Sequence, residues 1–140
     1  MSCDEKNTKC SDSNKTSGDA GQQDTSEPAE GILLVMGTDT IGKEEEIGKV
    51  LAKGFFETMR ETKELPHTIF LLNAGVRLTT VNDELIPVLK DIESMGVEIY
   101  SCGTCLKYYD LEDKLQVGHR GSTGIIIEGM QDFKKTVWIG

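Results

Sequence analysis

Apolar side chains are scarce at the start of the chain and then occur in short runs. Residues 1–30 contain no Ile, Leu, Val, Phe, Trp or Tyr and are rich in Ser, Thr, Asn, Asp, Gly and Gln. Such a segment cannot bury enough apolar surface to offset its ordering entropy, about 1–2 kcal/mol per residue for the backbone alone. We therefore expect a disordered acidic tail or linker over residues 1–30 and one folded domain over residues 31–140.

Four short runs in the folded part have the pattern of strands. Residues 32–36 (ILLVM) are uninterrupted apolar residues, which is typical of a strand buried on both faces. Comparable runs occupy residues 67–73 (HTIFLLN), 97–101 (VEIYS) and 135–139 (KTVWI). We expect each of these four runs to be a strand.

Longer amphipathic stretches separate the predicted strands. Residues 43–62 place apolar side chains at spacings of three and four, as in a helix with one buried face. A second helix is expected to begin at a cap, Asn82 or Asp83, and to end at Gly96. A short helix is expected within residues 106–115.

Residues 121–133 are ambiguous. The β-branched run 125–127 favours a strand locally, whereas Ile126, Met130 and Phe133 have helical spacing. We choose a helix, because consecutive parallel strands need a crossover connection. The alternation of strands and helices then predicts an α/β fold with three layers, α/β/α, around a mostly parallel sheet. In such sheets ligands gather at the carboxyl ends of the strands.

Composition narrows the classes of partner. The 140 residues include 24 acidic and 15 basic side chains, a formal charge of −9, which argues against nucleic acid or an anionic membrane as a main partner. No apolar run approaches the roughly 18 residues of a membrane span, and the N-terminus lacks the apolar stretch of a signal peptide. We expect a cytoplasmic protein, in which closely spaced cysteines serve redox or metal chemistry more often than structural disulfides.

The motif Cys102-Gly103-Thr104-Cys105 directly follows a predicted strand and opens a predicted helix. Backbone N–H groups and the helix dipole at such a position stabilise a thiolate and lower its pKa from about 8.5. Gly103 would let the backbone pass close to a bound sulfur species, and the second thiol is near enough to form a disulfide. The motif therefore predicts redox or sulfur-transfer chemistry. Two alternatives stay open: packed structural thiols, or half of a metal site completed from the tail by Cys3 and Cys10.

Other candidates are expected at the same sheet edge. Thr38 lies in a loop, residues 37–42, whose N–H groups could bind an anion, although a plain capping turn explains that loop equally simply. Asn73, Gly75 and Arg77 follow the second strand and should stand beside the cysteines. Arg77 could stabilise a thiolate or persulfide, or be a solvated loop arginine. Further candidates, with packing or plain exposure as their alternatives, are Tyr108, Tyr109 and His119.

Two segments resemble the DsrE/DsrF-like family, specifically its YedF branch, which is associated with selenium metabolism. They are FLLNAGVRLTTVNDELIPVLKDIESMGVEIYSCGTCLKYYDLEDKLQVG and GKEEEIGKVLAKGFFETM, and the resemblance covers residues 31 to about 118. It implies a flavodoxin-like domain with five parallel strands, assembled into trimers or hexamers. A fifth strand would then lie within residues 115–128, at 115–117 or in the run 125–127. Thioredoxin is a poorer match, since no proline follows Pro87 to face the cysteines.

The resemblance also implies roles for the cysteines. Cys102 matches the persulfide-bearing cysteine of the family, and Cys105 matches the second thiol of its CxxC-bearing members. We therefore expect a sulfurtransferase-like relay of sulfur or selenium, without a cofactor, between donor and acceptor proteins. The chain departs from the family in having no Cys-Pro motif of a TusA-like domain and in the residues that follow Gly118. The alternatives are a non-catalytic binding or assembly module and a small-molecule or flavin site at the sheet edge.

Overall fold

The structure is a computed structural model that describes residues 29–140. Five strands form one parallel sheet in the order β4-β3-β2-β1-β5. Their bounds are β1 Ala29–Met36, β2 Pro66–Leu71, β3 Glu98–Cys102, β4 His119–Gly121 and β5 Lys135–Ile139. Most of the predicted tail, with Cys3 and Cys10, lies outside the described residues.

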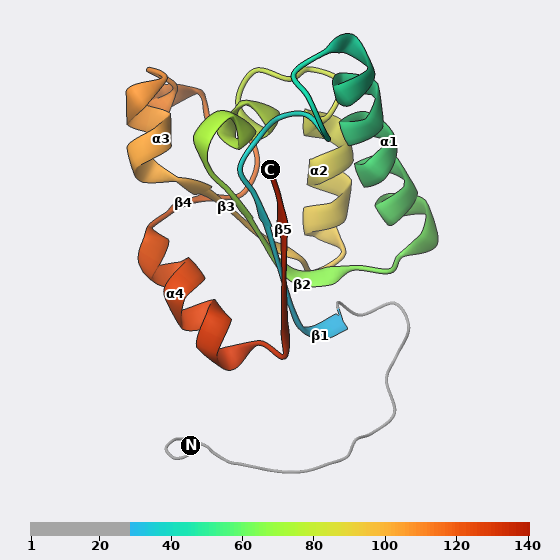
Figure 1. The fold of residues 1–140 in the computed structure, drawn as a ribbon, viewed down its shortest axis with the longest axis vertical. Coiled ribbons are helices and arrows are strands. Elements are labelled where there is room, and N and C mark those ends of the chain that lie inside the picture. The colour runs from blue at the N-terminus through green and yellow to red at the C-terminus, as the bar shows by residue number, and fades with distance from the viewer. Residues whose placement is uncertain (1–28) are drawn as a thin grey trace.

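Helices cover both faces of the sheet (Figure 1). Helices α1 (Glu46–Thr62) and α2 (Ile86–Ser94) lie on one face, and α3 (Gly103–Tyr108) and α4 (Thr123–Asp132) lie on the other. Two 3₁₀ helices, η1 (Asn73–Thr79) and η2 (Glu112–Lys114), complete the chain. The predicted three-layer α/β/α architecture with a parallel sheet of five strands is confirmed.

The alternation of side chains along β1 explains why its sequence is apolar without a break. Leu34 and Met36 belong to the core under α1 and α2, whereas Leu33 and Val35 belong to the core under α3 and α4. All four are buried, so both faces of this central strand contact apolar side chains. A strand covered by two helical layers has no solvent-facing side, and a continuous apolar run results.

Most predicted elements are found with shifted ends. The predicted bounds of β5 agree with the structure, and the ambiguous segment 121–133 is the helix α4, as chosen. The segment after β2 is the 3₁₀ helix η1, which is anchored by the Gly75 amide donating to the Leu72 carbonyl. Neither Asn82 nor Asp83 is the cap of α2, whose N-cap is Leu85; the Oδ1 of Asn82 accepts from the amides of Glu84 and Leu85 in the turn before the helix.

The fifth strand lies within the expected range 115–128, but both exact placements within that range are wrong. The run 125–127 lies in α4, and the edge strand is β4, three residues with the polar sequence HRG. Its pairing with β3 joins His119 to Tyr100 and Gly121 to Cys102. Gly118, with φ +73°, turns the chain into this pairing. A side chain at position 118 would collide with the Ile99 carbonyl. A short, exposed edge strand has no apolar pattern by which a sequence could reveal it.

A buried pair of hydroxyls joins η1 to β3. The Oγ atoms of Thr79 and Ser101 lie 2.7 Å apart in fully buried residues. Replacing Thr79 with valine keeps the shape and leaves the Ser101 hydroxyl without this partner, so we expect the free energy of unfolding to fall by about 1–3 kcal/mol. Urea denaturation measures this change. Thr79→Ser, which keeps the hydroxyl, is the matched control; a valine variant as stable as the wild type would contradict the expectation.

Candidate functional site

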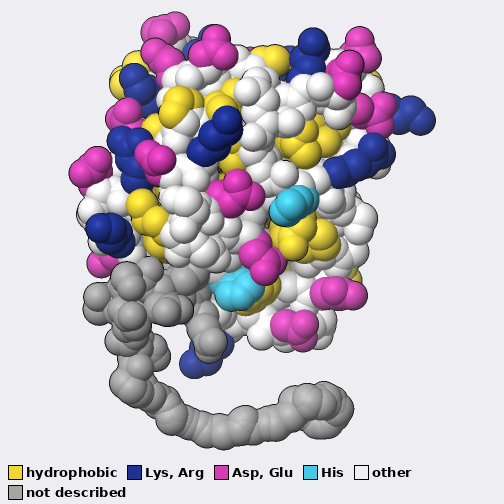
Figure 2. All heavy atoms as spheres, turned by 180° about the vertical axis from the view of Figure 1, so that it is seen from behind, with side chains coloured by type: hydrophobic (Ala, Val, Ile, Leu, Met, Phe, Trp, Pro, Cys, Tyr) yellow, Lys and Arg dark blue, Asp and Glu magenta, His cyan; other side chains and the backbone are white. Residues whose placement is uncertain are grey.

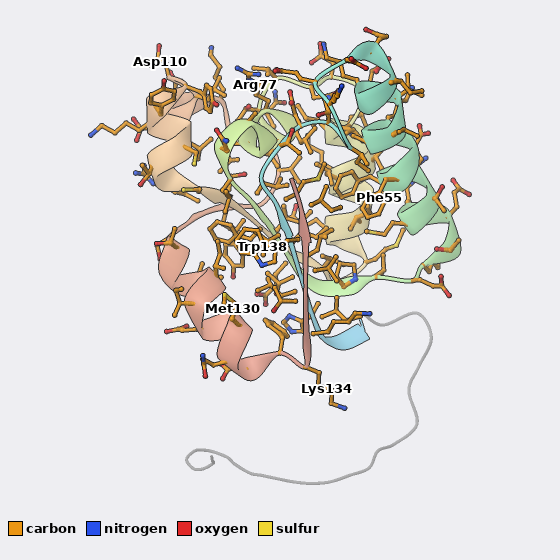
Figure 3. The ribbon with its side chains drawn as sticks, in the orientation of Figure 1. Phe55, Arg77, Asp110, Met130, Lys134 and Trp138 are labelled. Atoms are coloured by element: carbon orange, nitrogen blue, oxygen red, sulfur yellow. The ribbon has the colours of Figure 1, made fainter. Side chains whose placement is uncertain are left out.

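The carboxyl ends of the three strands β1, β2 and β3 meet at one edge of the sheet, as they must in parallel strands. The loop 37–45, helix η1 and helix α3 leave the sheet there, side by side at the upper edge in Figure 1. Figure 3 places Arg77 at the same edge. The segments predicted to carry chemistry therefore come together in the fold.

The CGTC motif has the predicted strand-to-helix position. Strand β3 ends at Cys102 and α3 begins at Gly103. Cys102 is only 4% exposed and packs in the apolar core under α3 and α4, whereas Cys105 is half-buried. Both thiols are free, and Cys102 lies near enough to Cys105 to raise its pKa. A partner molecule approaching this edge would meet Cys105 before Cys102.

A backbone donor is aimed at the Cys105 sulfur. The amide N–H of Asn73 donates to its Sγ at a distance of 3.0 Å. Asn73 has φ +52°, a left-handed conformation that asparagine tolerates better than most residues, and its Oδ1 accepts from the Tyr109 hydroxyl at 2.9 Å. The conformation of Asn73 is thus held from the side of α3, which keeps its amide pointed at the thiol.

The pKa of Cys105 is raised, opposite to the direction predicted for a thiol at a helix N-terminus. Burial is the main cause, and the neighbouring Cys102 raises the pKa further by its hydrogen bond and its charge. The Asn73 amide acts in the other direction by stabilising the thiolate, but it does not outweigh the loss of solvation. Cys105 is therefore mostly a protonated thiol at neutral pH.

This pKa direction predicts how alkylation depends on pH. We expect the rate of iodoacetamide labelling at Cys105 to rise with a midpoint above the ordinary thiol value of about 8.5, because only the thiolate reacts. Replacing Cys102 with alanine removes a contribution that raises the pKa, so the midpoint should move down. Peptide mass spectrometry of quenched samples measures both profiles. A wild-type midpoint below the ordinary value would refute the predicted direction.

A polar cavity of about 310 Å³ lies beside this cysteine. Its walls are formed by the loop after β1, by η1 and by the end of α3, with the residues Gly37, Thr38, Asp39, Thr40, Gly42, Glu44, Asn73, Ala74, Arg77 and Tyr109. The guanidinium carbon of Arg77 lies 4.8 Å from the centre of the Tyr109 ring, and its Nη1 lies 3.8 Å from Asp39 Oδ2. Asn73 lines the cavity and also donates its amide to the half-buried thiol of Cys105.

The predicted rim residues divide into two groups. Thr38, Asn73 and Arg77 line the cavity. The other four do not: Gly75 and Gly103 are buried, and an added Cβ at Gly75 would come within 2.6 Å of the Met36 carbonyl oxygen. Thr104 and Tyr108 are exposed; Tyr108 is 81% exposed and contacts the ring of Tyr109 edge-on. On an α-helix, neighbouring residues point in directions about 100° apart, so only one of two adjacent tyrosines can face the cavity.

Sequence reasoning missed Asp39 and Arg120. The sequence offers a pattern that could have identified Asp39, since it lies between two threonines just after a buried strand. It offers none for Arg120, because the place of this residue depends on strand β4, whose bounds were not predicted. Its guanidinium lies against Gly103, where an added Cβ would collide with it, and its Nη1 donates to Glu112 Oε2 at 3.0 Å. The absence of a side chain at Gly103 thus makes room for the Arg120 guanidinium.

Other kinds of site find less support in the described part of the chain. No cluster of three or more His, Cys, Asp or Glu side chains in residues 31–140 is arranged to hold a metal ion. Acidic and basic side chains are interspersed over the face shown in Figure 2, which therefore lacks the basic expanse that nucleic acids require. Within residues 29–140 every helix is too short or too polar to cross a membrane.

Comparison with known proteins identifies the fold. No family model matches the sequence, and no curated protein matches it. Among solved structures, the YchN protein from E. coli is similar over 79% of this chain and 100% of its own, with 12% identity and a TM-score of 0.59.

Two further structures are similar, both of proteins described as having unknown function. MTH1491 from Methanobacterium thermoautotrophicum has 14% identity and a TM-score of 0.57 over 76% of this chain and 96% of its own. BT1422 from Bacteroides thetaiotaomicron has 18% identity and a TM-score of 0.55 over 78% of this chain and 95% of its own. At these identities the likeness shows a common α/β fold.

Proposed function

We propose that this chain is a sulfur relay protein of the DsrE-like, YedF type, which accepts a sulfane sulfur on its CGTC pair and passes it to an acceptor. One observation carries the proposal. A half-buried thiol, Cys105, stands at the carboxyl edge of a parallel sheet with the Asn73 amide directed at its sulfur and a second free thiol, Cys102, beside it. An N–H donor at this place stabilises the thiolate of Cys105, and the adjacent thiol offers a route for release.

The burial of the two cysteines leads us to exchange the roles that the sequence suggested. The resemblance assigned the persulfide to Cys102 and release to Cys105. Because Cys102 is 4% exposed and surrounded by apolar side chains, a donor protein reaches Cys105 more readily. In our proposal Cys105 receives the sulfur and Cys102 assists its release.

The steps balance without a cofactor. The Cys105 thiolate attacks the terminal sulfur of a donor persulfide, so that a new S–S bond forms at Cys105 and the donor leaves as a thiolate. An acceptor thiolate then attacks the outer sulfur and regenerates Cys105. Alternatively, the Cys102 thiolate attacks the inner sulfur, which releases hydrosulfide and leaves a Cys102–Cys105 disulfide. An external dithiol must then reduce that disulfide.

Intact mass spectrometry tests the proposal. The protein is incubated with a cysteine desulfurase and cysteine, desalted, and weighed before and after treatment with a dithiol. We expect a gain of one sulfur atom that the dithiol removes, and no gain in the Cys102→Ser/Cys105→Ser double variant. An unchanged mass would instead favour a non-catalytic binding or assembly module with a structural cysteine pair, which the burial of Cys102 also fits.

We also propose that the chain forms a homo-oligomer through α4 and the edge strand β5. Ile127, Met130 and Trp138 are 60%, 48% and 53% exposed, and among the strands of the described residues β5 is paired with β1 alone. Figure 3 shows Met130 on α4 and Trp138 on β5 on the same side of the sheet. Sedimentation velocity should show a species larger than a monomer that dissociates in Trp138→Glu, while Val81→Glu, an exposed apolar residue elsewhere, leaves it intact. A wild-type monomer at micromolar concentration would contradict this.

A further inference from the structure

The cavity beside Cys105 carries charges that the described residues leave without hydrogen bonds. The side chain of Asp39 is 15% exposed, and its Oδ1 is buried with no hydrogen-bond partner. Its Oδ2 has only the ion pair with Arg77 Nη1 at 3.8 Å, which is longer than a hydrogen bond. A largely buried carboxylate with so little compensation is costly, and a donor supplied by a ligand would reduce that cost.

Arg77 is rigidly placed, yet its side chain is available for a ligand. Its carbonyl accepts from the amides of Thr80, Val81 and Asn82 at 3.3, 3.1 and 3.0 Å, which fixes its backbone at the turn after η1. Its guanidinium lies over the Tyr109 ring, and within residues 31–140 its side chain makes no hydrogen bond. Five N–H donors in a fixed fork suit a carboxylate, which they bind with two parallel hydrogen bonds.

The balance of charge in the cavity decides between kinds of ligand. The lining contains two carboxylates, Asp39 and Glu44, and one guanidinium, Arg77. A simple anion such as phosphate would meet two negative charges, and a simple cation would meet the arginine. A molecule that carries both a carboxylate and an ammonium matches both signs, with its carboxylate on Arg77 and its ammonium on Asp39.

The size of the cavity agrees with a small ligand. Its volume of about 310 Å³ lies at the lower end of the range of about 300–1,000 Å³ that is typical of small-molecule sites. The lining is mainly polar, with threonine hydroxyls and Tyr109 at the walls. These features argue against a flavin, whose ring system requires extended apolar walls.

We propose that this cavity binds a free α-amino acid in its zwitterionic form, held between Arg77 and Asp39 with its side chain toward Cys105. Asn73, which lines the cavity, donates its amide to the Cys105 sulfur at 3.0 Å, so a single residue connects the cavity wall to the thiol. The binding itself goes beyond the relay. Only the further statement that the natural ligand carries sulfur, as cysteine does, rests on the proposed function.

The test measures binding of L-cysteine to the full chain by isothermal titration calorimetry under a phosphine reductant. N-acetyl-L-cysteine, which lacks the ammonium, and L-cysteine methyl ester, which lacks the carboxylate, are the matched ligands. We expect one site, with each altered ligand weakened at least about tenfold, since each loses one charged contact. This comparison uses the wild-type protein and does not depend on the folding of any variant.

Variants locate the site. Arg77→Gln and Asp39→Asn should each weaken L-cysteine at least about tenfold, and Arg77→Lys should recover only part of the loss because it lacks the planar fork. The matched controls are Arg60→Gln and Asp91→Asn, which remove another arginine–aspartate pair, between α1 and α2, and should leave binding unchanged. Absence of binding at millimolar ligand, equal binding of the three ligands, or equal affinity in the Arg77 and Asp39 variants would overturn the proposal.

The outcome separates this site from the relay. Amino-acid binding without sulfur loading would remove the relay and keep the site. Sulfur loading from a donor protein without amino-acid binding would keep the relay and remove the site.

Discussion

Cys105→Ser is expected to lose sulfur loading by at least about a thousandfold, the scale of loss that follows removal of a nucleophile. The reason is geometric. Cys105 is the thiol that a donor can reach, and the Asn73 amide is aimed at its sulfur and not at that of Cys102. Initial rates of mass gain with a desulfurase and cysteine measure the loss, with retained far-ultraviolet circular dichroism as the folding control.

The matched variant Cys102→Ser should separate the two thiols. Loading should persist, because Cys105 remains, whereas spontaneous release of sulfide should slow, because no neighbouring thiol can form the disulfide. Loss of loading in Cys102→Ser together with retention in Cys105→Ser would restore the roles implied by the family resemblance. Equal loading in both variants would show that the CGTC thiols do not differ in access.

Phe70→Ala is expected to be the most destabilising single change considered for this fold. Phe70 is fully buried in the central strand β2 and packs in the same apolar core as Cys102. Removing a buried phenyl ring leaves a cavity and costs about 3–5 kcal/mol, a large part of the roughly 5–15 kcal/mol that a typical domain has. Chemical denaturation measures the change in the free energy of unfolding.

Phe55→Ala is the matched control for the same substitution. Phe55 lies on α1 and is only partly buried, in edge-on contact with Phe56. We expect a smaller loss for Phe55→Ala, because less apolar surface leaves water there when the protein folds. A loss at Phe70 no larger than that at Phe55 would contradict the described core.

The parts of the fold that the sequence predicted are those with a repeated apolar pattern. The run 32–36 is buried on both faces and α1 on one, so their hydrophobic positions show directly which surfaces pack. The bounds of strand β4 could not be predicted, because its three residues lie at the sheet edge and pair through their backbone alone. Helix η1 escaped because it is held by local backbone bonds, such as that from Gly75 to Leu72, which do not impose an apolar period.

The sequence predicted where the candidate site lies, but not how its residues are buried or what they contact. Parallel topology brings the ends of β1, β2 and β3 to one edge, so Thr38, Asn73, Arg77 and the cysteines were expected together. The difference in burial between Cys102 and Cys105 was not predictable, since it depends on how α3 packs on the core. The raised pKa of Cys105 follows from the same packing, because burial outweighs the favourable backbone donor.

The most direct test of the relay is to locate the added sulfur. Protein loaded by a desulfurase and cysteine is alkylated without reduction and digested, and the peptide spanning residues 91–107, which holds both cysteines, is fragmented in a mass spectrometer. We expect one additional sulfur atom on Cys105 and an unmodified or simply alkylated Cys102. A peptide without added sulfur on either cysteine, from protein incubated with an active donor, would contradict the sulfur relay.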